Sequence, residues 1–276
     1  ELGLLDNIFP ELAHLKGVTQ PKEHFWDVFH HSIRTVQAVG FLLRDDDWEY
    51  ATEEALDMVP WSEELEQHFD REVSHGSTRK AMLKLAALLH DIAKPQTKTV
   101  EESGRTRFLG HAKEGALRVT DILERLRFST REIKLVEVMV RYHLRPTQMS
   151  REGLPTNRAI YRYFRDTGEA GIDILFLSLA DHLATRGENF DLSHWREHVE
   201  IVTHILTRHV EEAKLTVPPK LISGHDLIKL FRLSPGPLFG QILEAVREAQ
   251  AAGEISTRED ALRYVRRLLN LSVTKG

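Results

Sequence analysis

The sequence of 276 residues contains no cysteine. Disulfide bonds and thiolate metal sites are therefore excluded, and any metal would have to be bound by histidine and carboxylate side chains. No apolar run reaches the ~18 residues of a membrane-spanning helix, and no signal peptide is recognisable. These absences predict a cytoplasmic protein with no membrane partner. The chain begins at Glu1 and not at Met, which leaves open whether it is a piece of a longer protein.

A surplus of positive charge is also missing. The formal net charge is −5, so a contact with nucleic acid would need a local basic patch. The apolar fraction of 41% and the charged fraction of 29% are typical of a folded globular chain. The length suits one large domain or two modest ones.

Helical periodicity dominates what is present. Apolar side chains recur at helical spacing over residues 25–39 and 116–126. Two capping boxes predict the starts of further helices, at the pairs Ser129/Glu132 and Ser256/Glu259. Other helices are expected over the segments GIDILFLSLADHLATR, SHWREHVEIVTHILTRHVEEA, HDLIKLF and LFGQILEAVREAQAAG.

One strand signal interrupts the helices. Two short segments flank Ser103-Gly104 and predict a β-hairpin. Residues 44–77 hold twelve acidic residues and little periodicity, which predicts an insertion of short helices and loop, with Trp48 and Trp61 as core anchors. The predicted fold is all-α, a helical bundle with one small β-hairpin and a C-terminal helical subdomain. Its boundary is expected near residue 190 or at Pro218-Pro219.

The stretch KLAALLHDIAKPQTKT raises the question of function. It begins as an apolar helix surface that then carries His90, Asp91 and Lys94 without a change of register, and we expect Pro95 to end that helix. A buried histidine or aspartate is costly unless it is paired or binds a metal. An ordinary alternative is a hydrogen-bonded histidine followed by an aspartate that caps the helix end.

Four further residues are expected at helix ends or on apolar helix faces: His31, His111, His143 and Asp181. A set of neutral imidazoles and carboxylates suits a divalent metal such as Mn, Fe, Co, Ni or Zn, and suits Mg less well. The sequence therefore predicts a metal site that joins distant parts of the chain.

The segments HHSIRTV, LLHDIAK and SLADHLA resemble the ordered H…HD…D signature of the HD-domain metal-dependent phosphohydrolases. The run KLAALLHDIAKPQTKTVEESGRTRFLGHAKEGA is similar to the HD domain of bacterial tRNA nucleotidyltransferases, the CCA-adding and poly(A)-polymerase-like enzymes. The opening and tail segments resemble the same enzymes, so the likeness covers nearly the whole chain. It implies a connecting segment at 1–24, an HD domain at 25–190 with an acidic insertion at 44–77, and a C-terminal helical region at 191–276.

The resemblance also implies the site residues. The four signature metal ligands would be His31, His90, Asp91 and Asp181. The extra ligands of the two-metal variety would be His111 and His143. Asp91 would then bridge one or two ions of Mn, Fe, Co, Ni, Mg or Zn, and Lys94 would meet the substrate phosphate. Ala93 and Ala112 stand where the family usually has glycine and often has glutamate.

An enzyme that hydrolyses phosphomonoesters or phosphodiesters, including 2′,3′-cyclic phosphates and nucleotides, is the expected function. A nucleotidyltransferase head needs a Gly-Ser turn before spaced aspartates. The run Asp45-Asp46-Asp47 lacks this turn and is expected to be an exposed loop, so we expect no nucleotide addition. The alternative is the body and tail half of a tRNA nucleotidyltransferase-like protein, which binds tRNA and hydrolyses little. The oligomeric state stays open.

Weaker patterns have ordinary alternatives. The tail arginines could contact an RNA backbone or form a solvated face: Arg258, Arg263, Arg266 and Arg267. His194 and His198 fit an H-x-x-E-H peptidase pattern, for which a polar helix face is the better interpretation. Asp27 is either a partner that orients His31 or an ordinary surface aspartate. His24 is interpreted as a neighbouring residue without a role.

Overall fold

A computed structural model describes residues 3–21, 23–151, 153–214 and 220–273 of the chain. The proposed boundary residues Pro218 and Pro219 lie outside these ranges. Within them, no helix combines the length and the apolar character needed to cross a membrane. The chain divides into two units. The first is Glu1–Gly153 with Thr167–Thr203, and the second is Leu154–Asp166 with His204–Gly276. The domain ranges expected from the sequence stay a prediction.

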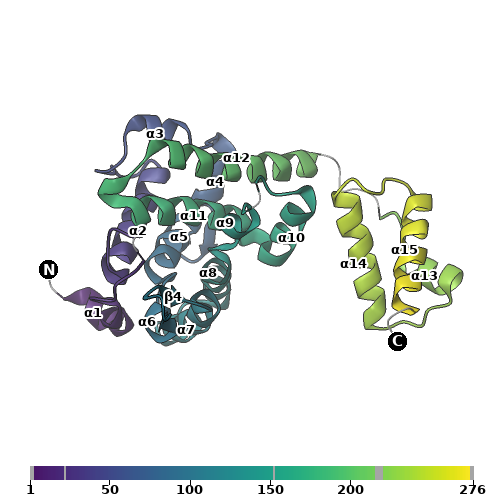
Figure 1. The fold of residues 1–276 in the computed structure, drawn as a ribbon, viewed down its shortest axis with the longest axis horizontal. Coiled ribbons are helices and arrows are strands. Elements are labelled where there is room, and N and C mark those ends of the chain that lie inside the picture. Colours follow the sequence, from purple (N-terminus) through teal and green to yellow (C-terminus); the bar gives the residue numbers. More distant parts are fainter. Residues whose placement is uncertain (1–2, 22, 152, 215–219, 274–276) are drawn as a thin grey trace. The chain divides into compact units, whose positions relative to one another are not determined.

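The all-α fold class is confirmed (Figure 1). The helices of the first unit are α1 (Leu4–Ile8), η1 (Pro10–Leu15), α2 (Val28–Leu42), α3 (Glu53–Asp57), α4 (Glu63–Asp70), α5 (Arg79–Leu89), α6 (Lys94–Thr97), α7 (His111–Arg125), α8 (Thr130–Tyr142), α9 (Arg145–Met149), η2 (Gly168–Ala170), α11 (Gly171–Arg186) and η3 (Gly187–Asn189). Two helices include residues of both units, α10 (Asn157–Thr167) and α12 (Leu192–Lys214). The last three are α13 (Gly224–Phe231), α14 (Pro237–Ala251) and α15 (Arg258–Val273).

The core of the first unit is formed by α2, α5, α8 and α11, and α7 packs on α8. Helix α11 is apolar on nearly every side, which suits its contacts with the other three helices. Gly115 lets α7 approach closely, because a Cβ atom there would lie 3.3 Å from Val140 Cγ1 and 3.6 Å from the His90 carbonyl oxygen. Tight packing at this point brings the start of α7 next to the end of α5.

The end of helix α5 differs from the expectation. Helix α5 ends at Leu89, and Pro95 lies in the first turn of α6 instead of ending α5. Proline is favoured there because its fixed φ fits a helix start and its missing N–H would have no partner. The capping box at Ser129/Glu132 is confirmed.

The second predicted capping box is displaced by one residue. Thr257 Oγ1 accepts a hydrogen bond from Asp260 N at 3.1 Å, and Asp260 Oδ2 accepts one from Thr257 N at 3.1 Å. Ser256 and Thr257 are both good caps, and the acidic residues Glu259 and Asp260 follow each of them at the same spacing. The sequence pattern alone therefore fits two registers.

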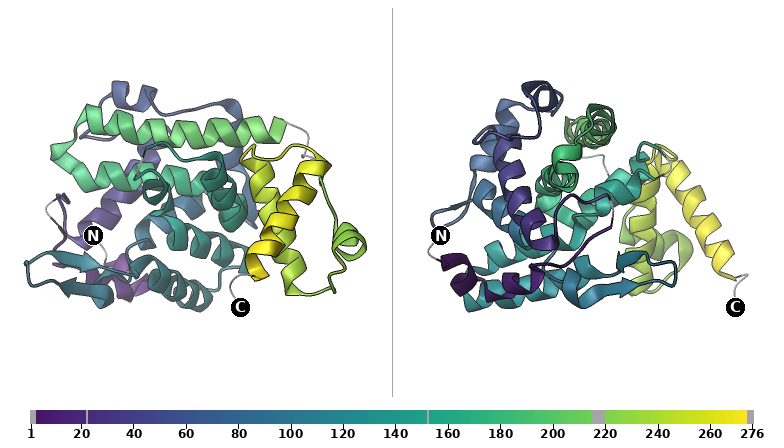
Figure 2. Two further views of the ribbon diagram at one scale, coloured as in Figure 1. Left: turned by 45° about the vertical axis from the view of Figure 1, so that its right-hand side comes forward. Right: turned by 60° about the vertical axis from the view of Figure 1, so that its left-hand side comes forward.

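The predicted hairpin is confirmed as β3 (Lys98–Val100) and β4 (Thr106–Phe108), which pair antiparallel (Figure 2). The acidic insertion holds a second hairpin, of β1 (Glu72–Ser74) and β2 (Ser77–Thr78), that the sequence analysis missed. These strands are too short to show alternation. Their turn contains Gly76 at φ 83°, a conformation that favours glycine.

The insertion is anchored in the interior. Trp48 is buried, whereas Trp61 is half-buried and stacks on Phe69 with ring centroids 6.1 Å apart. At the start of α5, the buried Arg79 guanidinium contacts Asp173 of α11 and donates from Nε to His68 Nε2 of α4 at 3.1 Å. Its Nη2 also donates to the Glu169 carbonyl at 2.6 Å. Arg79 thereby ties the insertion to the core.

Replacing Arg79 tests this link. The variant Arg79→Ala leaves the Asp173 carboxylate buried without its cation, and we expect it to lower the free energy of unfolding by about 3–5 kcal/mol. Lys80→Ala is the matched control, since the neighbouring lysine makes ion pairs with Asp45 and Asp70 at the surface. That loss should stay below about 1 kcal/mol. Urea unfolding measures both, and equal losses would contradict the role assigned to Arg79.

The last three helices have an apolar cluster of their own. Its buried members are Ile222, Leu227, Ile242, Val246, Ala249, Ile255, Ala261 and Val265. Within the same unit, α10 and α14 are joined by ion pairs. Arg162 and Arg165 reach Glu248 at 2.6 and 2.7 Å, and Arg158 reaches Glu254, just beyond the end of α14, at 2.8 Å. The C-terminal helices thus have both a core and a charged junction.

Candidate metal centre

The predicted ligands come together inside the first unit although they are distant in the sequence. His31 lies in the first turn of α2, and His111 begins α7. His90 and His143 directly follow the last residues of α5 and α8. Asp181 projects from the interior of α11. The site forms where two helix starts meet two helix ends.

His31, His90 and Asp181 form one side of the centre with Asp91. The Nε2 atom of His31 lies 3.0 Å from Asp181 Oδ1 and 3.3 Å from His90 Nε2. His90 Nε2 lies 3.2 Å from Asp91 Oδ2. His31, His90 and Asp91 each offer one candidate ligand atom, and these three atoms lie within 4.8 Å of one another.

The other side of the centre uses the second oxygen of the same carboxylate. His111 Nε2 lies 3.4 Å from Asp91 Oδ1 and 3.3 Å from His143 Nε2. Ligand atoms of these three residues again lie within 4.8 Å of one another. Asp91 therefore faces two histidine groups with its two oxygens, an arrangement compatible with a bridging carboxylate.

Backbone carbonyls fix the orientation of three imidazoles. Each Nδ1 donates to the carbonyl three residues earlier, in the pairs His90–Ala87 at 2.8 Å, His111–Phe108 at 2.7 Å and His143–Val140 at 2.7 Å. A carbonyl only accepts, so Nδ1 carries the proton and Nε2 of the neutral ring presents a lone pair. This is the orientation that metal-binding histidines adopt.

The pair His111 and His143 is suited to hold a cation between the two rings. Burial, together with the nearby His90 and His111, lowers the pKa of His143 to about 3. Burial also lowers the pKa of His111, so both rings are neutral near pH 7. Their bare nitrogens then face each other, and Asp91 Oδ1 adds a third acceptor with no donor among them. A metal ion resolves this repulsion, so the donor set fits a divalent metal.

The carboxylates are ionised. Burial raises the pKa of Asp91, but the charges of His90 and Lys94 outweigh it and hold that pKa well below its usual range. Burial also raises the pKa of Asp181, but the contact with His31 and the charge of His90 outweigh burial and hold that pKa well below its usual range. Within the described residues, neither oxygen of the buried Asp91 accepts a hydrogen bond of regular geometry, and its one cationic side-chain partner other than the histidines is the Lys94 ammonium, 2.6 Å from Oδ2. Such an unsatisfied carboxylate is expected at a metal site.

The pKa of His90 is raised. Burial alone would lower it, but the charges of Asp91 and Asp181 outweigh that effect. The site also faces the C-terminal ends of α5 and α8, whose aligned peptide dipoles present partial negative charge. Both features favour a positive charge at this position, whether it is a proton or a metal ion.

Lys94, the expected phosphate contact, is buried beside the centre. Its Nζ lies 2.6 Å from Asp91 Oδ2 and donates to Gln20 Oε1 at 2.6 Å. It also lies 5.4 Å from the centre of the Phe108 ring. The predicted residue is therefore at the site, with a partner, Gln20, that the sequence analysis did not identify.

His24 is a second residue that the sequence analysis passed over. Its ring centroid lies 5.6 Å from that of His31. Burial and the charge of Lys94 lower the pKa of His24 to about 4. It belongs to a loop without periodicity, so its position seven residues before His31 was the only available signal.

Two other candidates, Asp27 and His198, have structural roles. Asp27 caps α2 and accepts hydrogen bonds from His30 N and Gly17 N, each at 2.8 Å, and it does not orient the His31 ring. His198 Nε2 lies 3.1 Å from the Ser178 carbonyl oxygen. Neither His194 nor His198 belongs to a candidate metal-ligand group within the described ranges, so the peptidase pattern is not supported.

Comparison with known proteins agrees with this geometry. Residues 28–186 match the family described as HD domain. The chain belongs to the HD-domain family. It is also homologous, over 96% of its length, to curated tRNA nucleotidyltransferases. The resemblance noted in the sequence is thereby confirmed, and the groups of His and Asp residues are those of an HD domain that can hold a divalent metal.

Two relatives illustrate the extent of this homology. The HD-domain chain is 31% identical over 267 residues to the A-adding tRNA nucleotidyltransferase of Deinococcus radiodurans, which covers 52% of that enzyme. It is 33% identical over 267 residues to the CC-adding tRNA nucleotidyltransferase of Thermus thermophilus, which covers 50% of that enzyme. The chain thus spans about half the length of these curated relatives.

The number of metal ions can be tested at His111. If Asp91 bridges two ions, His111→Ala should lose one equivalent of Mn and keep the ion held on the side of His31 and Asp181. Elemental analysis after loading and desalting measures this change. His194→Ala, an exposed histidine paired with Asp191, is the control and should keep the wild-type content. An unchanged Mn content in His111→Ala would leave a single-ion site.

Proposed function

We propose that this HD-domain chain is a metal-dependent phosphohydrolase that acts on small phosphate esters. The substrates would be phosphomonoesters or phosphodiesters, including 2′,3′-cyclic phosphates and nucleotides. The observation that carries the proposal is the convergence of imidazole nitrogens on the two oxygens of Asp91, with the ammonium of Lys94 2.6 Å from the same carboxylate. The residues that would bind metal and the lysine that would bind an anion thus lie next to one another in the interior.

The residues divide the chemical tasks. Two groups would hold metal, His31, His90, Asp91 and Asp181 in the first and Asp91, His111 and His143 in the second. When bound, the metal acts as a Lewis acid and lowers the pKa of a water molecule. The Nδ1–H donors keep the histidines oriented, and Lys94 offsets negative charge that develops on the phosphate oxygens. Ala112 supplies no carboxylate for proton transfer.

Replacing Asp91 tests the proposal directly. Asp91→Ala removes the carboxylate shared by both histidine groups, and we expect hydrolysis to fall more than ~100-fold, beyond the usual loss at residues that only support ligands. Helix content should persist, because α5 is held by buried Leu83, Ala86 and Leu89. The assay uses 2′,3′-cyclic and 2′-nucleotides with Mn, Ni, Co and Mg. Asp121→Ala, at an exposed site on α7, is the control.

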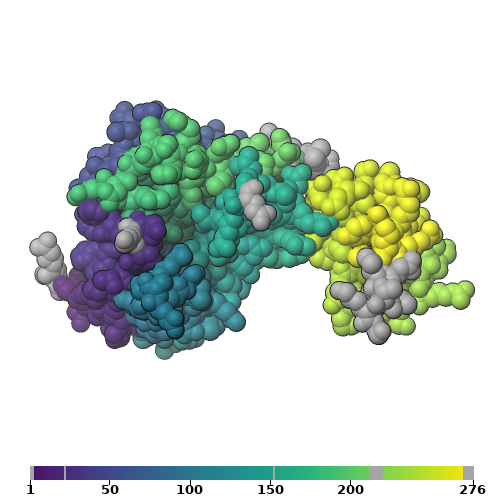
Figure 3. Space-filling model, viewed as in Figure 1, coloured from purple at the N-terminus to yellow at the C-terminus, as the bar shows by residue number. Residues whose placement is uncertain are grey.

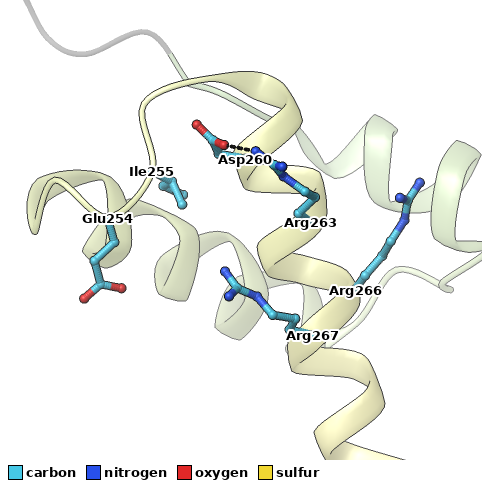
Figure 4. A pocket seen from close by; sticks show the side chains of 6 residues that line it. All are labelled: Glu254, Ile255, Asp260, Arg263, Arg266 and Arg267. Carbon is cyan, nitrogen blue, oxygen red and sulfur yellow. Dashed lines mark hydrogen bonds and ion pairs between the residues drawn. The ribbon is translucent and has the colours of Figure 1, made fainter.

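A second candidate function is RNA binding by the C-terminal helices. Its support is the homology to proteins named tRNA nucleotidyltransferases over 96% of the chain. Figure 4 shows Arg263, Arg266 and Arg267 on successive turns of α15, beside a pocket of about 390 Å³. Arg258 pairs with Asp226 at 2.6 Å, and Arg263 pairs with Asp260. Arg266 and Arg267 have no carboxylate partner within residues 220–269, so these two carry the free positive charge.

Salt dependence separates this candidate from hydrolysis. The double variant Arg266→Ala/Arg267→Ala should weaken tRNA binding and reduce the slope of log K against log salt by about 1–2. Arg258→Ala should change the slope less, because Asp226 already neutralises that charge. Filter binding over a KCl series measures both. Salt-dependent tRNA binding without hydrolysis under any of the four metals would favour the RNA-binding function and reject the hydrolase.

A further inference from the structure

A closed loop precedes α2 and borders the metal centre. Its ends are joined by a hydrogen bond from Val28 N to Val18 O at 3.1 Å and by one from Gly17 N to Asp27 Oδ2 at 2.8 Å. Residues 17–21 and 23–28 thus belong to a loop whose ends are joined, as they are in an Ω-loop. Phe25 N also donates to the Thr185 carbonyl at 3.0 Å, which attaches the loop to α11.

Gln20 connects this loop to the centre. Its Oε1 accepts a hydrogen bond from Lys94 Nζ at 2.6 Å, and its Nε2 donates to the Trp26 carbonyl at 3.2 Å. The second bond holds the amide so that its oxygen faces the ammonium. Figure 3 shows the N-terminal segment, in purple, directly against the segment near residue 100, in blue-green, which agrees with these contacts.

We propose that Gln20 is a positioning residue that holds the Lys94 ammonium ready to bind a phosphate oxygen. The inference rests on the proposed function, since it concerns the same phosphate. Lys94 has a flexible side chain that contacts two polar partners, Asp91 and Gln20. Asp91 is also required by the histidine groups, so its carboxylate serves two tasks. Gln20 is a neutral acceptor, which fixes the amine without cancelling its charge.

Chemistry supports a neutral partner at this position. An ammonium group has three donors, of which one bonds to Gln20, while Asp91 contacts the group as an ion pair at 2.6 Å. A donor remains for an anion, and the face of the Phe108 ring, 5.4 Å away, attracts the ammonium group without neutralising its charge. A carboxylate in place of Gln20 would hold the amine equally well but would repel a phosphate.

The loop offers a matched control one residue away. Thr19 Oγ1 accepts from Lys98 Nζ at 3.0 Å, so it makes the same type of loop-to-lysine contact at an exposed position away from the histidines. The two hydrogen bonds that join the loop ends, from Val28 N to Val18 O and from Gly17 N to Asp27 Oδ2, do not use Gln20. Replacing Gln20 therefore removes its bonds to Lys94 and to the Trp26 carbonyl but leaves the loop ends joined.

Binding of inorganic phosphate to the Mn-loaded protein, measured by calorimetry, tests the inference without turnover. Loss of a hydrogen bond to a charged group should make Gln20→Met bind phosphate about tenfold more weakly, with unchanged Mn content. Thr19→Ala should bind as the wild type does. Gln20→Glu should also weaken binding, because its charge neutralises Lys94.

A double variant shows whether the effect acts through Lys94. In a Lys94→Met background, Gln20→Met should produce no further loss, and the single variants decide the matter if the double variant does not fold. The inference is overturned if Gln20→Met binds phosphate normally, if its effect persists without Lys94, or if the Mn-loaded wild type binds no phosphate. Phosphate binding that depends on Gln20, with no ester hydrolysed, would reject the hydrolase and keep the positioning role.

Discussion

The contact of His111 and His143 at 3.3 Å is the interaction on which the site depends. Each ring gives its only proton to a backbone carbonyl, so two lone pairs and an oxygen of Asp91 meet in the interior without a donor. A chain that folds this way stores repulsion unless a cation is present. The close packing of α7 at Gly115 and the ends of α5 and α8 enforce this meeting.

Helix α5 links two ionic groups of opposite character. At its start, Arg79 forms an ion pair with Asp173 and donates a hydrogen bond to His68, so these three buried side chains are paired with one another. Beyond its end, the buried Asp91 pairs with Lys94, but neither of its oxygens accepts a hydrogen bond of regular geometry within the described residues. A fully satisfied buried network stabilises a fold, whereas an incompletely satisfied one is typical of a site that binds a ligand. The same helix thus shows why burial of charge alone does not identify a functional site.

Much of the site could be predicted from the sequence because its members occupy periodic helices. His31 and Asp181 lie on apolar helices and His90 and Asp91 directly follow one, so their position in or beside the interior was foreseeable. The end of α5 at Leu89 could not be predicted, because the apolar pattern continues through Ile92. Gln20 and His24 lie in a loop whose contacts are purely tertiary, and no local pattern predicts those. The register of the cap at Thr257 was equally undetermined, since two overlapping motifs fit.

The apolar cluster of the C-terminal helices has a thermodynamic consequence. Its buried members all lie between Ile222 and Val265, whereas the proposed metal ligands lie between His31 and Asp181. A ligand stabilises only the part of a chain whose native form binds it. A bound metal ion should therefore raise the melting temperature of the helices that carry the histidines more than the melting temperature of the C-terminal cluster. One melting temperature does not then describe the whole chain, and a calorimetric trace need not fit a two-state transition.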